Sequence, residues 1–127
     1  MPVLILMSRI GFYLSIVAIS YLSVATLEQP AISTGWDKAN HFIAFFVLLA
    51  LFDYAHATLS LWKYQLPLLT AYGLLIEIVQ LYLPYRMFSF ADVAADVLGL
   101  ICYVVLRRPI RFAVSYLDNK VIVRHRE

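Results

Sequence analysis

Nine polar side chains interrupt a chain that is otherwise almost entirely apolar, and they include acids, bases, a histidine, an amide and a hydroxyl. Ionisable groups within membrane segments cost on the order of 3 kcal/mol each or more, so they usually mark a functional site and its partners. Both signs of charge occur in the set, and its members can therefore compensate one another. The set consists of Asp37, Lys38, His41, Glu77, Gln80, Arg86, Ser89, Asp92 and Asp96.

One chemistry that these residue types support is recognition of an anionic or amphipathic headgroup. Arg86 offers a planar fork that matches phosphate or carboxylate, and Lys38 offers a point charge. His41 and Ser89 can add hydrogen bonds, while the carboxylates orient the bases or bind amine and sugar hydroxyl groups. On this interpretation the ligand-binding residues are Lys38, Gln80, Arg86, Ser89 and Asp96.

A second chemistry is catalysis. His41 lies one helical turn after Asp37 and would be an oriented base, with Ser89 as nucleophile or Glu77 as general acid. Alternatively, a divalent metal would bind to Asp37, His41, Glu77 and Asp92, because carboxylates and imidazole suit such ions. The sequence contains neither H-E-x-x-H nor G-x-S-x-G, so the catalytic hypothesis depends on residue types alone and the catalytic residues stay open.

A third interpretation is structural. Asp37 with Lys38 and Arg86 with Asp92 would form ion pairs that fix the loops. Polar contacts between membrane helices contribute only about 0.6 kcal/mol on average, so nine polar residues exceed what folding requires.

Three members of the set are nevertheless expected to help hold the helices together. We expect the Gln80 amide to form a contact between helices. We expect Asp96 either to pair with Arg86 or to be protonated and donate a hydrogen bond. Ser89 lies directly before an apolar segment, where a serine typically caps the N-terminus of a helix.

The composition indicates what kind of protein carries these residues. Of its 127 residues, 63% are hydrophobic and 14% are charged, whereas soluble domains have roughly 25% charged residues. The chain therefore reads as an integral membrane protein of one domain, with no feature of a nucleic-acid-binding protein. Its single cysteine, Cys102, cannot form an internal disulfide.

Four apolar stretches approach the length of about 20 residues that a membrane-spanning helix needs. They predict an all-α bundle of four transmembrane helices, at about residues 10–27, 40–57, 64–83 and 90–106, within a domain of residues 1–106. Residues 107–127 form a basic tail, either solvated or folded as a helix on the membrane surface.

The basic residues predict the orientation of the bundle. Arg107, Arg108 and Arg111 follow the last apolar stretch, Arg9 precedes the first, and Lys63 lies in the middle loop. The positive-inside rule therefore places both termini in the cytoplasm, an N-in and C-in arrangement.

Helical periodicity then brings the polar residues together. Glu77 and Gln80 share one face of the third helix, and Ser89, Asp92 and Asp96 share one face of the fourth. Counted from the helix ends, all lie within roughly 10 Å of the outer end of the bundle. Gly73 and Gly99 lie on the same faces and would permit close helix approach. Asp53 and His56 lie at the opposite end, where we expect an interfacial position and no site.

Three blocks of residues carry a resemblance to a known family. Residues 37–45 are similar to a D-K-x-x-H-F-x-A-F pattern, residues 77–80 to E-x-x-Q, and residues 84–92 to P-x-R-x-x-S-x-x-D. In this order they resemble the VanZ-like family. The family usually has an asparagine where this chain has Asp96. The resemblance implies a small bacterial multi-pass membrane protein, in a family whose founding member is associated with teicoplanin resistance.

The expected function is recognition of a cell-envelope lipid headgroup or a lipoglycopeptide, contributing to glycopeptide resistance or envelope maintenance. The alternatives are a membrane-embedded hydrolase or transferase acting on a lipid-linked substrate, with or without a divalent metal, and a structural or partner-binding membrane protein. No other cofactor is expected. The expected partners are membrane lipids and lipid-linked cell-wall intermediates, and the expected location is the bacterial cytoplasmic membrane.

Overall fold

The computed structural model describes residues 2–25 and 35–124, and for residues 35–36 and 119–124 it describes only the backbone. Helices account for nearly all of these residues, and none of the described residues lies in a strand. The helices are α1 (Pro2–Val24), α2 (Gly35–Ala55), α3 (Leu66–Leu81) and α4 (Phe90–Arg124), with a short π-helical segment η1 (Leu61–Gln65) leading into α3. The prediction of an all-α fold with four long helices is confirmed.

The helix ends differ from the predicted ones. α1 begins at Pro2 rather than at residue 10, and α2 begins at Gly35 rather than at residue 40. The predicted end of the first helix, at residue 27, lies outside the described residues. The α1 helix begins early because the apolar residues 3–7 belong to it, and α2 begins early because residues 35–39, which we had expected in a loop, continue the helix.

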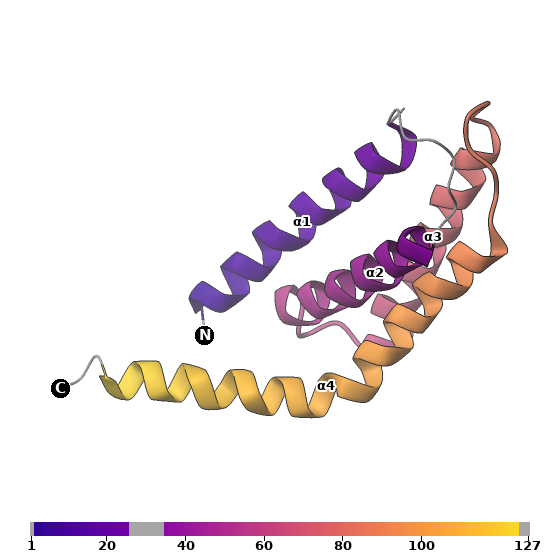
Figure 1. Cartoon of the computed structure of the whole chain (residues 1–127). Helices are drawn as coiled ribbons and strands as arrows, with labels where there is room; N and C mark the ends of the chain where they lie inside the picture. Colours follow the sequence, from indigo (N-terminus) through magenta and orange to yellow (C-terminus); the bar gives the residue numbers. More distant parts are fainter. Residues whose placement is uncertain (1, 26–34, 125–127) are drawn as a thin grey trace.

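The largest difference concerns the predicted boundary at residue 106. α4 continues without interruption to Arg124 and contains Pro109. Proline lacks an N–H group, so the carbonyl of Val105 loses its helical donor and the helix can bend there. Figure 1 shows the bend, with the second half of α4 turning away from α3. The basic tail is therefore, as far as it is described, a continuation of the fourth helix, and its position at a membrane surface stays a prediction.

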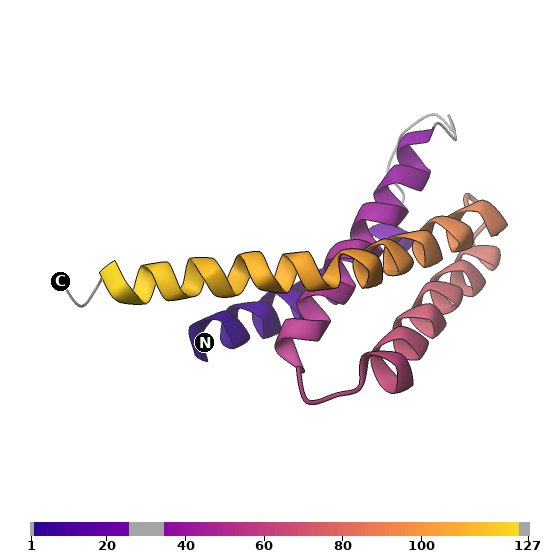
Figure 2. The same ribbon diagram turned by 90° about the horizontal axis from the view of Figure 1, so that it is seen from below.

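The helices pack around α2, which contacts both α1 and α4, while α3 packs against α4 (Figures 1 and 2). The rings of Phe12 on α1 and Phe52 on α2 stack with centroids 4.6 Å apart. Gly99 lies where α4 crosses α2, and an added Cβ atom there would come within 3.0 Å of the Phe42 carbonyl oxygen. The prediction that Gly99 permits close helix approach is confirmed.

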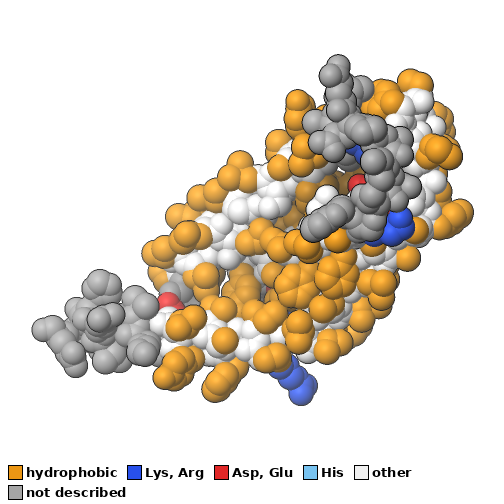
Figure 3. All heavy atoms as spheres, viewed as in Figure 1, with side chains coloured by type: hydrophobic (Ala, Val, Ile, Leu, Met, Phe, Trp, Pro, Cys, Tyr) orange, Lys and Arg blue, Asp and Glu red, His pale blue; other side chains and the backbone are white. Residues whose placement is uncertain are grey.

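The outer surface is dominated by apolar side chains. Large apolar side chains are exposed on every helix, and Figure 3 shows hydrophobic side chains spread along the described helices on one face. Three helical segments are long and apolar enough to cross a membrane: Pro2–Val24, Asp37–Ala55 and Leu61–Leu81. The α4 helix does not meet the same criterion, because Asp92, Asp96, Arg107 and Arg108 make its apolar part shorter.

Candidate functional site

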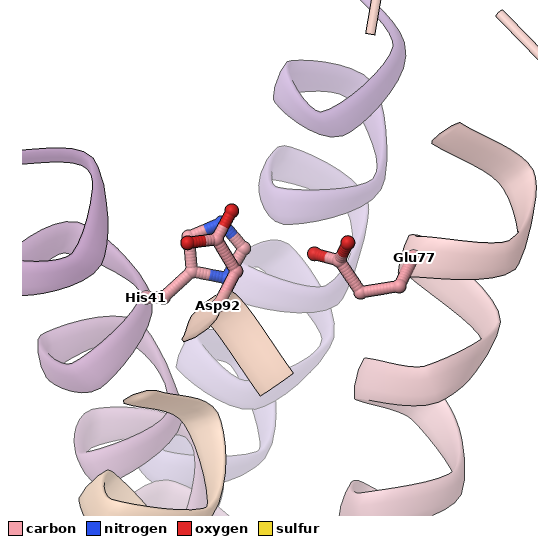
Figure 4. A group of neighbouring side chains, drawn as sticks. All are labelled: His41, Glu77 and Asp92. Carbon is pink, nitrogen blue, oxygen red and sulfur yellow. The ribbon is translucent and has the colours of Figure 1, made fainter. Parts of the chain in front are cut away.

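Three side chains from three helices converge at one end of the bundle. His41 lies in the first half of α2, Glu77 in the last turns of α3 and Asp92 in the first turn of α4. Each offers one potential ligand atom, and these atoms lie within 4.8 Å of one another. Figure 4 shows the Glu77 carboxylate facing the His41 ring and the Asp92 carboxylate. The polar stripes predicted from periodicity therefore do meet at one level.

His41 is held by a fourth member of the predicted set. Its Nδ1 atom lies 2.9 Å from Oδ1 of Asp96, and its Nε2 atom lies 3.9 Å from Oδ2 of Asp92. An ionised carboxylate only accepts hydrogen bonds, so this pairing assigns the Nδ1 proton to the bond with Asp96. Below, His41, Glu77, Asp92 and Asp96 are called the acidic cluster.

Glu77 is fully buried, with 0% of its surface exposed. Its Oε2 atom accepts the backbone N–H of Ser89 at 2.9 Å. Its Oε1 atom, and likewise Oδ2 of Asp96, is buried and has no hydrogen-bond partner in the described part of the chain. Leaving a buried polar group unpaired costs about 1–3 kcal/mol, and more for a charged group. Such atoms in a native protein therefore point to a bound water, ion or ligand.

A comparison with known protein families shows to which family the chain that carries this site belongs. The family model described as VanZ/LLP1 matches residues 3–111. The chain belongs to the VanZ/LLP1 family. The match runs from the start of α1 to residue 111 within α4 and includes the whole acidic cluster, and it confirms the resemblance found in the three sequence blocks. No curated protein and no solved structure matches the chain significantly. Membership of this family and the three helices that are long and apolar enough to cross a membrane together identify a membrane protein.

In this VanZ/LLP1 protein Ser89 caps a helix. Its Oγ atom accepts the backbone N–H of Asp92 at 3.2 Å, which satisfies a free donor in the first turn of α4. In a capping box, a side chain three residues later would bond to the N–H group of Ser89. Here Glu77 from α3 occupies that position instead. The cap therefore fixes α4 to α3 beside the acidic cluster.

Arg86 and Gln80 bond to the end of α1 rather than to the acidic cluster. Arg86 donates from an Nη atom to the carbonyls of Leu22 and Ala25, at 3.3 and 3.5 Å. Gln80 donates to the carbonyl of Ser23 at 3.1 Å. Carbonyls in the last turn of a helix generally need donors from outside the helix, and positive charge is also favourable there. Gln80 thus makes an interhelical amide contact.

Two ion pairs considered from the sequence are not formed among the described residues. Arg86 pairs with neither Asp92 nor Asp96, because its guanidinium is directed to α1. The expectation that Asp96 partners Arg86 is wrong, since Asp96 bonds to His41.

Asp37 and Lys38 are exposed at the start of α2, at the same end of the bundle as the acidic cluster. We expected Asp37 to orient His41 and to join a metal-binding group. The structure gives the first role to Asp96, which faces His41 across the α2–α4 interface. Asp37 precedes His41 by one turn, and the metal-competent group contains His41, Glu77 and Asp92 without it.

At the opposite end, this VanZ/LLP1 protein has an ionic network around a buried carboxylate, which was not predicted from the sequence. Asp53, expected at an interface, is 1% exposed. It accepts hydrogen bonds from the Tyr103 hydroxyl at 2.9 Å, from two Arg107 nitrogens at 2.8 Å each, and from Arg111 at 3.1 Å. The signal was the spacing of Tyr103, Arg107 and Arg111, each four residues apart and so on one face of a helix.

Proposed function

We propose that the acidic cluster is the working site of this membrane protein and that it binds the polar headgroup of a cell-envelope lipid. The class includes lipid-linked cell-wall intermediates and lipoglycopeptides. The observation that supports the proposal most directly is the convergence of His41, Glu77 and Asp92 from three helices, beneath an otherwise apolar surface. Polar groups at such a position are costly, and a ligand that uses them offsets the cost.

The unpaired atoms indicate which headgroup chemistry fits. Oε1 of Glu77 and Oδ2 of Asp96 are acceptors, so they suit hydroxyl or amine donors of a sugar or amino sugar. Lys38 is exposed near the start of α2 and can reach an anionic group outside the cluster. The exposed apolar faces of the helices suit an acyl or polyprenyl chain that stays in the membrane. An amphipathic ligand of this kind meets both surfaces at once.

The orientation that we propose places the acidic cluster near the outer leaflet. The first part of α4 packs along α2 and α3, so it would cross the membrane with them despite its charges. Lys63 and the arginines of α4 then lie in the cytoplasm, in agreement with the positive-inside rule. The topology is four spans with both termini inside.

Thiol labelling in intact cells tests this topology, in a background in which Cys102 is replaced by alanine. Met87 lies in the α3–α4 loop and is 86% exposed. Met87→Cys should react with a membrane-impermeant reagent added outside, while Lys63→Cys should react only after permeabilisation. The reverse pattern would reject the proposed orientation.

Binding measurements test the function itself. In lipid nanodiscs, the purified full chain should bind an amino sugar linked to undecaprenyl diphosphate, or teicoplanin, saturably. Glu77→Gln keeps the size of the side chain but removes its charge, so binding should fall about 10-fold to 100-fold, as expected for a charged hydrogen bond of about 1.5–3 kcal/mol. His56→Ala, at the other end of α2, is the matched control and should bind as the wild type does. No saturable binding of either ligand would refute the proposal.

A second candidate function is favoured by the hydrogen bond between His41 and Asp96. A histidine whose Nδ1 is bound by a carboxylate is an oriented base, as in hydrolases. The protein would then cleave or transfer a headgroup of a lipid-linked diphosphate. Mass spectrometry of that substrate after incubation should show a product with the wild type and none with His41→Ala. Unchanged substrate with the wild type would leave binding as the function.

A further inference from the structure

We propose that His41, Glu77 and Asp92 coordinate one divalent ion of the first transition row, and that this ion presents open positions to phosphate oxygens of the lipid ligand. The second part of the proposal rests on the proposed function, whereas the first stands on the geometry of the cluster alone. The residue types fit, because imidazole and carboxylate are common ligands of Zn²⁺ and related ions.

The distances are close to those that a metal ion needs. Zinc–ligand distances to nitrogen and oxygen are about 2.0–2.2 Å, so two donors on one ion lie at most about 4.2 Å apart. Nε2 of His41 and Oδ2 of Asp92 are 3.9 Å apart, which is within that limit. The whole group lies within 4.8 Å. The side chains of the group would have to approach by about 0.6 Å to share one ion at zinc–ligand distances.

The surroundings of the three residues are those of metal ligands. A histidine that binds a metal usually donates its other ring N–H to a carboxylate, which fixes the ring. Asp96 fills this role for His41, at 2.9 Å from Nδ1, and leaves Nε2 free. Glu77 is likewise held at Oε2 by the N–H of Ser89, while its buried Oε1 has no partner among the described residues. Two of the three ligands, His41 and Glu77, are therefore oriented on one side and unpaired on the other.

Charge supplies an independent reason for a cation. The cluster contains three carboxylates and one imidazole, and no lysine or arginine of the described chain forms an ion pair with it. The two nearest basic side chains by sequence are Lys38, which is exposed, and Arg86, which bonds to α1. Buried charges are normally paired or bind metal. A divalent ion compensates two negative charges at the position where the side chains converge (Figure 4).

Three protein ligands also leave coordination positions open. Metal sites that act on substrates typically have three protein ligands plus water or substrate, whereas closed structural zinc sites have four. Phosphate oxygens bind well to such ions. An acidic cluster that would otherwise repel a phosphate thus becomes able to hold one.

Metal binding by the full chain in detergent tests the first part of the proposal. The protein is freed of metal with a chelator and then titrated with Zn²⁺, with Mn²⁺ in a parallel series. The wild type should bind one ion per chain and melt at a higher temperature as the ion is added, since a ligand that binds only the folded state stabilises it. His41→Ala and Glu77→Gln should each abolish the shift.

Asp96→Asn separates an orienting role from a purely structural one. This variant should still bind one ion, with an affinity about 10-fold to 100-fold lower, as is usual when a partner of a ligating histidine is changed. His56→Ala is the matched control and should bind the ion as the wild type does. If the wild type shows no melting shift, or if the shift persists in both His41→Ala and Glu77→Gln, the metal proposal is refuted; the wild-type measurement decides even if a variant does not fold.

A lipid arm separates the metal proposal from the proposed function. Undecaprenyl phosphate and undecaprenol are each titrated with and without Zn²⁺. Tighter binding of the phosphate, dependent on Zn²⁺, supports both parts. Saturable lipid binding whose affinity does not change when Zn²⁺ is added overturns the metal-bridged contact and leaves the proposed function intact. Zn²⁺ binding with no binding of the phosphate supports the metal site and overturns the metal-bridged contact, and the proposed function is decided separately by the nanodisc titration.

Discussion

The crossing of α2 and α4 should tolerate no side chain larger than hydrogen at position 99. A Cβ atom added to Gly99 would come within 3.0 Å of the Phe42 carbonyl oxygen, and would lie 3.1 Å from the backbone nitrogen of Phe46. Both obstacles are backbone atoms of α2, so no change of rotamer can relieve the contact. Gly99→Ala therefore forces the two helices apart.

The magnitude follows from two opposing terms. Alanine is favoured over glycine inside a helix by about 0.5–1 kcal/mol, and overpacking a tight contact costs about 1–3 kcal/mol. Because the obstacle is backbone, we expect the upper part of that range and a net loss of about 2 kcal/mol. Gly11→Ala is the matched control. Its Cβ would meet only the two methyl groups of Leu51, at 3.3 and 3.5 Å, so helix propensity should dominate and stability should stay equal or rise.

The single cysteine provides the assay. Cys102 is partly buried in α4, three residues after Gly99, and a fluorogenic thiol reagent will label it as the helices separate on heating. Measured in one detergent, Gly99→Ala should have the lowest melting temperature, and the wild type and Gly11→Ala should both melt at a higher temperature. A Gly99→Ala protein that melts at or above the wild-type temperature would show that α2 and α4 do not approach as closely as described.

Two further predictions concern the polar contacts away from the acidic cluster. Asp53→Asn should destabilise the protein by about 2 kcal/mol in the same thiol assay. Breaking a buried ion pair from one side costs about 3–5 kcal/mol, but the cost is lower here because Arg107 and Arg111 are 33% and 40% exposed and can recover solvation. An unchanged melting temperature would contradict this prediction. Gln80→Leu removes the donor to the Ser23 carbonyl and should lower the stability by about 1 kcal/mol. Hydrogen exchange should become faster in the last turn of α1 and nowhere else. Uniformly faster exchange along α1 would argue against a local contact.

The position of the acidic cluster could be predicted because it depends on few variables. Helical periodicity places Glu77 on one face of its helix and Asp92 on one face of the next, and the short loop between them fixes their relative depth. Any antiparallel pair of helices built from these segments brings the two residues to one level. The pairing of His41 with Asp96 rather than with Asp37 could not be predicted, since it depends on the rotation of α2 against α4.

The remaining differences arise from contacts that connect distant segments. Arg86 looked like a ligand-binding residue because its type suits phosphate, yet it donates to the carbonyls of Leu22 and Ala25. Asp53 looked interfacial because it lies near the predicted end of the second helix, and its partners Arg107 and Arg111 were assigned to a tail beyond the fourth helix. Once α4 continues through Pro109, those two arginines and Asp53 face one another. An error in one helix end therefore concealed a buried network.

The acidic cluster and the glycine crossing are one mechanical unit, even though Gly99 contacts none of the four cluster residues directly. Phe42, whose backbone limits the space at position 99, is the residue after His41. The Gly99→Ala substitution pushes this part of α2 away from α4. It therefore moves His41, on α2, away from Asp92 and Asp96, which lie on α4 with the added methyl group. His41 Nε2 and Asp92 Oδ2 are already 3.9 Å apart, close to the limit of about 4.2 Å for two ligands of one ion. A separation of a few tenths of an ångström should therefore weaken metal binding as well as stability. Gly11→Ala, on a helix that contributes no ligand, should leave metal binding unchanged.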